Sequence, residues 1–281
     1  MRKEDILCQE NENIEVRLLL EAIYRKYGYD FRDYGRAHIK RRVKHRLSLS
    51  DFNSISDITH RVLYDQSFFE SLLLDFSINV SEMFRDPPVY LAIKRKVIPL
   101  LKTYPFVKIW NAGCATGEEV YSIAIILKEE GLYKKCQIYA TDFNQIVIQK
   151  AKEGIYPVDH VRKYTRNYQS AGGTGSFSDY YTANYGRVIM DKALKENIVF
   201  ADHNLVTDGA FGEMQLIICR NVLIYFKQKL QNQVVSLFTK SLAPGGFLCL
   251  GSKEDLRFSD CYSDYTITAE KEKIYRKRYP E

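Results

Sequence analysis

Two glycines and one acid have the types and spacing of a ligand-binding turn. Gly113 and Gly117 bound the run GCATG, which follows an apolar strand pattern, and Asp142 ends the next strand pattern. The glycines can adopt positive φ and let a ligand approach the backbone at the start of the following helix. A carboxylate at the second strand end could accept hydrogen bonds from both hydroxyls of a ribose. The spacing is typical of an α/β unit that binds a nucleotide-like ligand.

The turn lacks the central glycine of the G-x-G-x-x-G pattern, which brings bare backbone against a pyrophosphate. Its absence favours an adenosine ligand that carries no phosphates, and S-adenosylmethionine fits that description. A crossover between parallel strands that binds no ligand remains the alternative, because short motifs give false positives.

The elements that must position this turn alternate between short apolar strands and helices after Pro87. A helix is expected over residues 119–128, and a turn, APGG, over residues 243–246. The closing segment, YTITAEKEKIYRKRY, is expected to be an antiparallel last strand. The other expected strands are VKIWNAG, CQIYATD, NIVFADHN, MQLIICRN and FLCLGS. This order predicts an α/β fold with a mainly parallel sheet.

Three segments are expected along the chain. Residues 1–76 should form an N-terminal all-helical domain, because their apolar positions keep helical spacing and strand patterns are absent. Residues 77–90 would be a linker that contributes to the ligand site, with Pro87 and Pro88 starting a helix. Residues 91–281 would be the ligand-binding domain, and their tyrosine-rich stretch at about 157–197 is interpreted as a small inserted β subdomain.

Composition limits the class of protein. The 46% hydrophobic and 27% charged content of the 281 residues is ordinary for a globular protein. No apolar run approaches the ~20 residues of a membrane span, and the N-terminus lacks the apolar core of a signal peptide. We therefore expect a cytoplasmic protein without membrane insertion. The six cysteines form no C-x-x-C pair, so no metal is expected.

A basic helix is expected within the N-terminal domain. Ile39, Val43 and Leu47 would face its core, which leaves most of the cations toward solvent, where neighbours four residues apart repel. An acidic protein surface is a candidate partner for this face. A merely solvated face and a nucleic acid are the alternatives, although base-stacking aromatic residues are missing from the run. The cations are Arg36, Lys40, Arg41, Arg42, Lys44 and Arg46.

Five separated segments, in order, resemble the chemotaxis receptor methyltransferases of the CheR family. They are SINVSEMFRDP, GCATGEE, ATD, HNL and CRNVLIYF, and with RRVKHR the resemblance covers nearly the whole chain. It implies a class I methyltransferase-like, Rossmann-type domain that uses S-adenosyl-L-methionine and releases S-adenosyl-L-homocysteine. It also implies methyl transfer to glutamates on the cytoplasmic helices of methyl-accepting chemoreceptors. We further expect a monomer, and no nucleic-acid partner because base-stacking aromatic residues are missing beside the cations.

The resemblance further implies which residues form the site. Arg85 and Tyr225 match the positions that the family places nearest the reacting methyl group, and the basic helix would dock the substrate. Ser81 stands where many relatives have threonine and keeps the hydroxyl. The implied cofactor-binding residues are Asn79, Ser81, Arg85, Gly113, Glu118, Asp142, Asn204, Leu205, Arg220 and Asn221.

Several of these side chains also have a purely structural interpretation. Glu118 could simply place favourable charge at a helix N-terminus, and Asp142 could cap the helix that begins near Asn144. Arg85 could pair with a neighbouring surface acid, and Tyr225 could be core.

Two questions of function stay open on the sequence. A methyltransferase acting on RNA or a small molecule, or a non-catalytic module that binds the cofactor or its product, would carry a similar cofactor turn. In some relatives the β subdomain binds a peptide at the receptor C-terminus. The GGTG run at residues 172–175 could form the turn that such a tether needs, or an ordinary hairpin loop.

Overall fold

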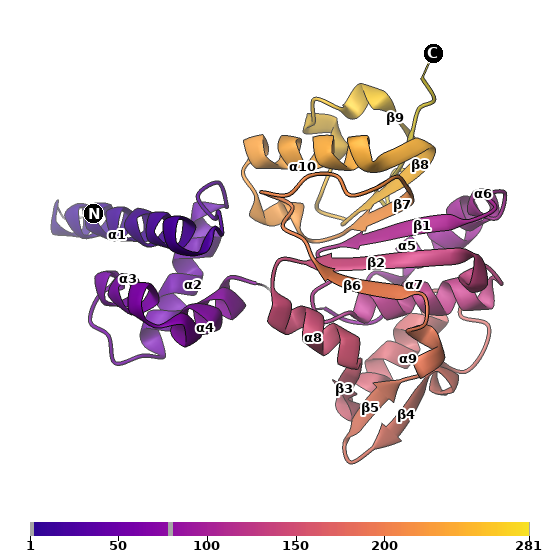
Figure 1. The fold of residues 1–281 in the computed structure, drawn as a ribbon, viewed down its shortest axis with the longest axis horizontal. Helices are drawn as coiled ribbons and strands as arrows, with labels where there is room; N and C mark the ends of the chain where they lie inside the picture. Colours follow the sequence, from indigo (N-terminus) through magenta and orange to yellow (C-terminus); the bar gives the residue numbers. More distant parts are fainter. Residues whose placement is uncertain (1–2, 78–80, 281) are drawn as a thin grey trace. The chain divides into compact units, whose positions relative to one another are not determined.

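The computed structural model describes residues 3–77 and 81–280. The chain divides into two compact units, which are described separately below (Figure 1). The helical unit comprises residues up to 78 together with residues 225–231. The α/β unit comprises residues 79–224 and 232–281.

In the described residues of the helical unit, four helices pack around a small apolar core. Leu19, Ile23, Val43, Ile58 and Leu72 have no exposed surface. The third helix begins at a capping box, which satisfies N–H groups that would otherwise lack partners. The helices are α1 (Lys3–Tyr27), α2 (Arg36–Ser48), α3 (Ile55–Tyr64) and α4 (Gln66–Phe76). None of the described helices combines the length and the apolarity that crossing a membrane requires.

The described part of the α/β unit contains a seven-stranded sheet in the order β6-β2-β1-β7-β8-β10-β9. The first five strands in this order are parallel, and β10 runs antiparallel to both β8 and β9. The strands are β1 (Val107–Ala112), β2 (Cys136–Asp142), β6 (Ile198–Asp202), β7 (Met214–Cys219), β8 (Leu242–Leu250), β9 (Tyr265–Ala269) and β10 (Ile274–Lys277). The α/β fold with a mainly parallel sheet and a helical N-terminal domain is confirmed.

Helices cover both faces of this sheet. Trp110 packs edge-on against Phe238 of α10, whereas its neighbour Ile109 lies in the core that includes α7. Because successive residues of a strand point to opposite faces, α10 and α7 lie on opposite sides of the sheet. The helices are α5 (Pro87–Ala92), α6 (Ile98–Leu101), α7 (Glu118–Glu129), α8 (Gln145–Glu153), α9 (Val161–Ser170) and α10 (Gln228–Ser241). The helix start predicted at Pro87 and Pro88 is confirmed.

Two predictions near the C-terminus were wrong. The APGG run is not a turn between elements, because α10 ends at Ser241 and β8 begins at Leu242; the run forms a bulge within β8, where Gly245 has φ 77°. The closing segment is not one strand. It forms an antiparallel hairpin of β9 and β10, because the chain turns at residues 270–273, with Lys273 at φ 54°.

The tyrosine-rich stretch carries a three-stranded antiparallel sheet, β3-β5-β4. Its strands are β3 (Ile155–Pro157), β4 (Tyr181–Asn184) and β5 (Arg187–Met190). The GGTG run lies after α9, and the β4–β5 hairpin instead turns at Tyr185 and Gly186, so the hairpin interpretation of GGTG was wrong. A side chain at Gly173 would overlap the ring of Tyr168, which explains a glycine there.

Candidate active site

The glycine turn is fixed by packing on both sides. Gly113 and Gly117 have φ of 77° and 92°, and Ala115 between them is also left-handed, at 46°. A Cβ on Gly113 would lie 2.6 Å from the side chain of Val222, and one on Gly117 would lie 2.9 Å from that of Ala151. Both glycines are therefore required by backbone angle and by neighbouring side chains. The turn occupies the carboxyl end of β1, where the strand order reverses and open α/β sheets bind ligands.

Asp142 ties the end of β2 to this turn. Its carboxylate accepts hydrogen bonds from the backbone N–H of Ala115 at 3.0 Å and of Asn144 at 3.1 Å. Asn144 supplies the side-chain cap of α8, so Asp142 is not that cap. Burial raises the pKa of Asp142 to about 6, and the backbone donors oppose the rise. Each oxygen keeps acceptor capacity for a ribose hydroxyl.

Glu118 opens α7 and lies almost entirely inside the unit. The Thr116 hydroxyl donates to its carboxylate at 2.7 Å. Burial raises the pKa of Glu118, and hydrogen bonds from Thr116 and Ser81 offset part of that rise. The Glu118 carbonyl accepts from Ser122, whose hydroxyl in turn accepts the N–H of Phe84 at 2.9 Å. These contacts connect the linker to the start of α7.

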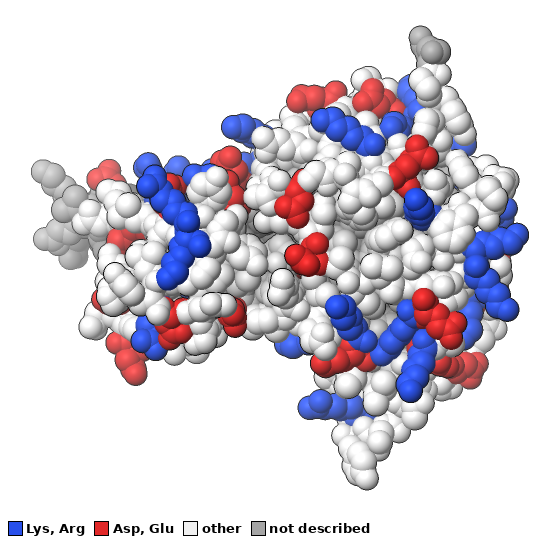
Figure 2. All heavy atoms as spheres, in the orientation of Figure 1, with Lys and Arg blue, Asp and Glu red and all other residues white. Residues whose placement is uncertain are grey.

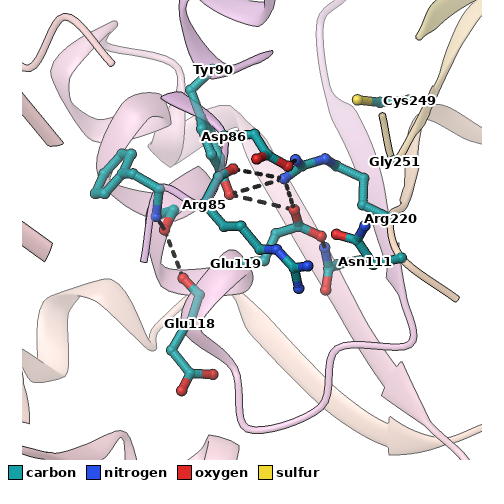
Figure 3. Close-up of polar contacts among 12 residues, drawn as sticks. Arg85, Asp86, Tyr90, Asn111, Glu118, Glu119, Arg220, Cys249 and Gly251 are labelled. Carbon is teal, nitrogen blue, oxygen red and sulfur yellow. Dashed lines mark hydrogen bonds and ion pairs between the residues drawn. The ribbon is translucent and has the colours of Figure 1, made fainter. Parts of the chain in front are cut away.

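Arg85 projects from a strained segment of the linker. Phe84 and Asp86, on either side of it, have φ of 53° and 59°, which non-glycine residues seldom adopt. Phe84 is buried and anchors the turn. In Figure 3 the Arg85 side chain extends toward Glu119 and Asn111. The backbone on both sides of Arg85 is thus held in a costly conformation, at the residue for which the family resemblance implies a place near the reacting methyl group.

Arg220 joins the linker to α7 through two ion pairs. Its guanidinium, 2% exposed, lies 2.7 Å from the Asp86 carboxylate and 2.7 Å from that of Glu119. It also donates to the carbonyl of Arg85 at 3.2 Å. Burial acts to lower the pKa of Arg220, but the charge and hydrogen bond of Glu119, together with Tyr90 and Cys249, outweigh burial and keep that pKa above the usual range. Figure 3 shows the guanidinium among these groups and Tyr90. Arg220 therefore holds the linker against the start of α7.

Glu119 is a site residue that sequence reasoning missed. Its second carboxylate oxygen accepts from the Asn111 amide at 3.0 Å, so it bridges β1 and Arg220. The Glu-Glu doublet after the glycine turn was a signal, but the sequence pointed only to its first member. Among the described residues, the Asn111 Oδ1 and Arg220 Nε atoms are buried without a hydrogen-bond partner. Such atoms beside the turn suit a polar ligand.

Glu254 is the second missed residue. Its carboxylate is buried and accepts hydrogen bonds from the backbone of residues 221, 222, 224 and 251. It thereby holds the loop after β7, in which Asn221 is left-handed at φ 62°. No motif marked this acid in the sequence.

The HNL segment follows β6 and reaches the end of β2. The His203 N–H donates to the Asp142 carbonyl at 3.0 Å, and the His203 ring contacts the Gly209 carbonyl. The Asn204 side chain accepts from the N–H of Val206, which turns the chain. The segment thus places Asn204 and Leu205 next to the strand end that carries Asp142.

The two remaining predicted site residues are Asn79 and Tyr225. Asn79 lies outside the described residues. Tyr225 belongs to the helical unit, where its carbonyl accepts the Gly35 N–H at 2.7 Å and its ring meets His38 edge-on.

The expectation that most cations of the basic helix face solvent holds for three of the six, because Arg36, Arg41 and Lys44 are exposed, whereas Lys40, Arg42 and Arg46 are half-buried. Lys40 and Lys44 pair with Glu12 of α1 at 2.5 and 2.6 Å, and Arg46 pairs with Asp75 of α4 at 2.5 Å. Acids within the helical unit therefore provide part of the expected acidic contact. Ile39 and Val43 are buried as predicted, whereas Leu47, which was also expected to face the core, is half-buried. Figure 2 shows a stripe of Lys and Arg side chains over the helical unit.

The sheet order, the glycine turn and the acid at the end of β2 define a Rossmann-type methyltransferase domain. Residues 79–270 match the family described as "CheR methyltransferase, SAM binding domain", and residues 14–77 match "CheR methyltransferase, all-alpha domain". The chain therefore belongs to the CheR methyltransferase family, as the sequence resemblance indicated. It is a methyltransferase whose cofactor is S-adenosylmethionine.

Relatives cover nearly all of the chain. The Pseudomonas putida protein Cher3 is 52% identical over 270 residues, which is 96% of this chain and 98% of Cher3. The chemotaxis protein methyltransferase of Listeria monocytogenes is 26% identical and covers 84% of this chain and 87% of its own length. The N-methyltransferase NodS of Bradyrhizobium japonicum, solved with S-adenosyl-L-homocysteine, is 15% identical with a TM-score of 0.39, covering 72% of this chain and 90% of its own.

Proposed function

We propose that the chain transfers the methyl group of S-adenosylmethionine to glutamate side chains on the cytoplasmic helices of chemoreceptors, which forms methyl esters. The observation that carries the proposal is Arg85, whose cationic side chain is presented on a strained turn beside the cofactor-binding turn. A planar guanidinium suits recognition of a carboxylate. Relatives named chemotaxis protein methyltransferase support the same substrate class.

The chemistry needs little besides positioning. A glutamate carboxylate, with a pKa near 4.3, is ionised at neutral pH, so no general base is required. When bound, S-adenosylmethionine supplies an electrophilic methyl group on a sulfonium. The receptor carboxylate oxygen bonds to that carbon, and the carbon–sulfur bond breaks with its electron pair going to sulfur. The products are a methyl ester and S-adenosyl-L-homocysteine, and no proton moves.

The proposed roles divide among the chain's own residues. Asp142 accepts hydrogen bonds from the ribose, and Glu118, Asn204 and Leu205 line the rest of the cofactor together with the linker. Arg85 orients the incoming carboxylate. Because its charge also stabilises the carboxylate before reaction, Arg85 acts by positioning.

Nearby cysteines are poor nucleophiles and do not suggest a covalent intermediate. Burial raises the pKa of the Cys114, Cys219 and Cys249 thiols, so each stays protonated at neutral pH. Direct transfer from the cofactor to the substrate is therefore the simplest course.

The exposed cations of α2 are proposed to dock the receptor. Arg36 and Arg41 are exposed, whereas Lys40, Lys44 and Arg46 form ion pairs with acids of the helical unit, and Arg42 is half-buried. Chemoreceptor methylation helices lie in the cytoplasm, so the enzyme would work there, as a monomer.

A labelling assay tests the proposal. The protein is incubated with S-adenosylmethionine carrying a radiolabelled methyl group, together with receptor cytoplasmic fragments or with RNA. Label released as methanol by mild alkali supports ester formation on the receptor. Stable label on RNA, or no transfer to either substrate while the cofactor still binds, contradicts it.

A further inference from the structure

The Glu254 carboxylate is enclosed by backbone N–H groups. One oxygen accepts from Gly251 at 2.5 Å and Asn221 at 3.1 Å, and the other accepts from Val222 at 2.8 Å and Ile224 at 3.3 Å. The residue is 4% exposed, and in the described part of the chain no Lys or Arg forms an ion pair with it. Several N–H groups converging on one point form an anion site, which an internal carboxylate fills here.

The segment held in this way is the loop that follows β7. It contains Arg220, whose guanidinium clamps the linker, and Asn221, whose left-handed backbone is costly without external support. Gly251 permits the arrangement, because a Cβ there would lie 2.8 Å from both the Asn221 nitrogen and the Glu254 carboxylate. Glu254 thus holds the backbone of residues 221–224, while the ion pairs with Asp86 and Glu119 hold the Arg220 side chain.

The same loop supports the glycine turn. The Val222 N–H donates to Glu254, and the Val222 side chain occupies the space beside Gly113, where an added Cβ would lie 2.6 Å away. A shift of the loop would therefore move Val222 relative to the turn. Glu254 is thus connected to the cofactor-binding turn through Val222, although it does not contact the turn itself.

We propose that Glu254 is a positioning residue for S-adenosylmethionine, acting through the loop at residues 220–224 and the contact of Val222 with Gly113. Its loss weakens cofactor binding, whereas turnover at saturating cofactor changes little, because Glu254 does not contact the reacting atoms. The proposal concerns cofactor binding alone and is independent of which substrate accepts the methyl group.

The test replaces Glu254 by glutamine, which keeps the shape but turns one acceptor oxygen into an NH₂ group facing N–H donors. Calorimetric titration with S-adenosyl-L-homocysteine should show a Kd raised about tenfold or more, since a buried charged acceptor is lost. The KM for S-adenosylmethionine should rise in parallel, with kcat within about threefold. A Kd within twofold of wild type overturns the proposal.

Glu129→Gln is the matched control. The Glu129 side chain is 3% exposed and also accepts a backbone N–H, from Thr174 at 3.0 Å, but it lies at the far end of α7 and pairs with Lys94. The Glu129→Gln variant should have a lower Tm than the wild type and an unchanged Kd for S-adenosyl-L-homocysteine. Equal weakening of binding in both variants would mean general destabilisation and would also overturn the proposal.

If Glu254→Gln does not fold, Val222→Ala tests the contact between Val222 and Gly113 separately. It leaves the carboxylate and all four donors in place and removes only the methyl groups beside Gly113. The Kd should rise by a smaller factor, about threefold to tenfold, with kcat kept. An unchanged Kd for this variant would contradict the path from Glu254 to the turn.

Discussion

The Arg220 guanidinium lies 2.7 Å from the Asp86 carboxylate, although 134 positions separate the two residues in the chain. The same guanidinium contacts Glu119 at 2.7 Å. Arg220 thus fixes the linker that carries Arg85 against the helix that follows the glycine turn. Removing either acid should disturb both stability and the placement of Arg85.

Glu119→Gln should destabilise the protein more than Asp86→Asn. The Glu119 side chain is 15% exposed and that of Asp86 is 42%, so solvent screens the second pair more strongly. We expect a loss of about 2–4 kcal/mol in the free energy of unfolding for Glu119→Gln, and about 1 kcal/mol or less for Asp86→Asn. Urea unfolding followed by circular dichroism measures both. The reverse order would mean that Asp86 is the more important partner of Arg220.

Arg85→Ala should lose most turnover while the fold and cofactor binding persist. The substitution removes the group proposed to orient the carboxylate, and the flanking left-handed residues keep their backbone. Arg85→Lys should recover only part of kcat, because an ammonium lacks the planar two-point geometry of a guanidinium. Transfer rates to receptor fragments, with S-adenosyl-L-homocysteine titration as the control, separate these outcomes. Unchanged transfer in Arg85→Ala would exclude Arg85 from the site.

Cofactor affinity should fall as the solution is acidified through about pH 6. The pKa of Asp142 is raised to about 6 by burial, and protonation removes the negative charge that a ribose hydroxyl would meet. In the unliganded protein, folding favours the protonated form, so the stability contributed by Asp142 is lost as pH rises through about 6. Titrations with S-adenosyl-L-homocysteine between pH 5 and pH 7.5 should show the affinity change.

Asp142→Asn is the control for this pH dependence. Burial also raises the pKa of Glu118, which could contribute to the same titration. If Asp142 is responsible, the asparagine variant should bind more weakly at pH 7.5 and show a nearly flat profile. A profile that keeps its full slope would assign the effect to Glu118.

Reversing the charge of Arg41 should raise the KM for the receptor without changing cofactor affinity. Arg41 is exposed on α2, where it can meet acidic residues of a substrate helix. Arg41→Glu should increase that KM severalfold at low ionic strength and less at high salt, because salt screens exposed charges. Lys152→Glu, on an exposed position of α8, is the matched reversal and should have little effect. Equal effects of both variants would indicate dependence on net charge alone.

The sequence predicted those parts of the fold and site that depend on neighbouring residues. The strand at residues 107–112, the glycine turn and the acid at residue 142 lie within one short unit, where periodicity and backbone preference act locally. The ion pair of Arg220 with Asp86 could not be predicted from local patterns, because only the sheet topology brings these two distant segments together. Glu254 was missed for the same reason.

The wrong predictions also have physical causes. APGG carries strong turn residues, yet pairing with β7 keeps it within β8 as a bulge. The six cations of α2 form a uniform run in the sequence. Three of them form ion pairs with Glu12 of α1 or Asp75 of α4, which the sequence run does not reveal. In both cases tertiary contacts override a local pattern.

Mapping the site of the transferred methyl group is the decisive experiment for glutamate methylation by this protein. Receptor cytoplasmic fragments are incubated with the protein and S-adenosylmethionine, digested, and analysed by mass spectrometry before and after mild alkali. We predict that glutamates in the receptor helices gain the mass of one methyl ester, that alkali removes this ester, and that Arg85→Ala removes most of the methylation. Methylation of another residue type, or none on receptors from the same organism although S-adenosyl-L-homocysteine binds, would contradict the proposed function.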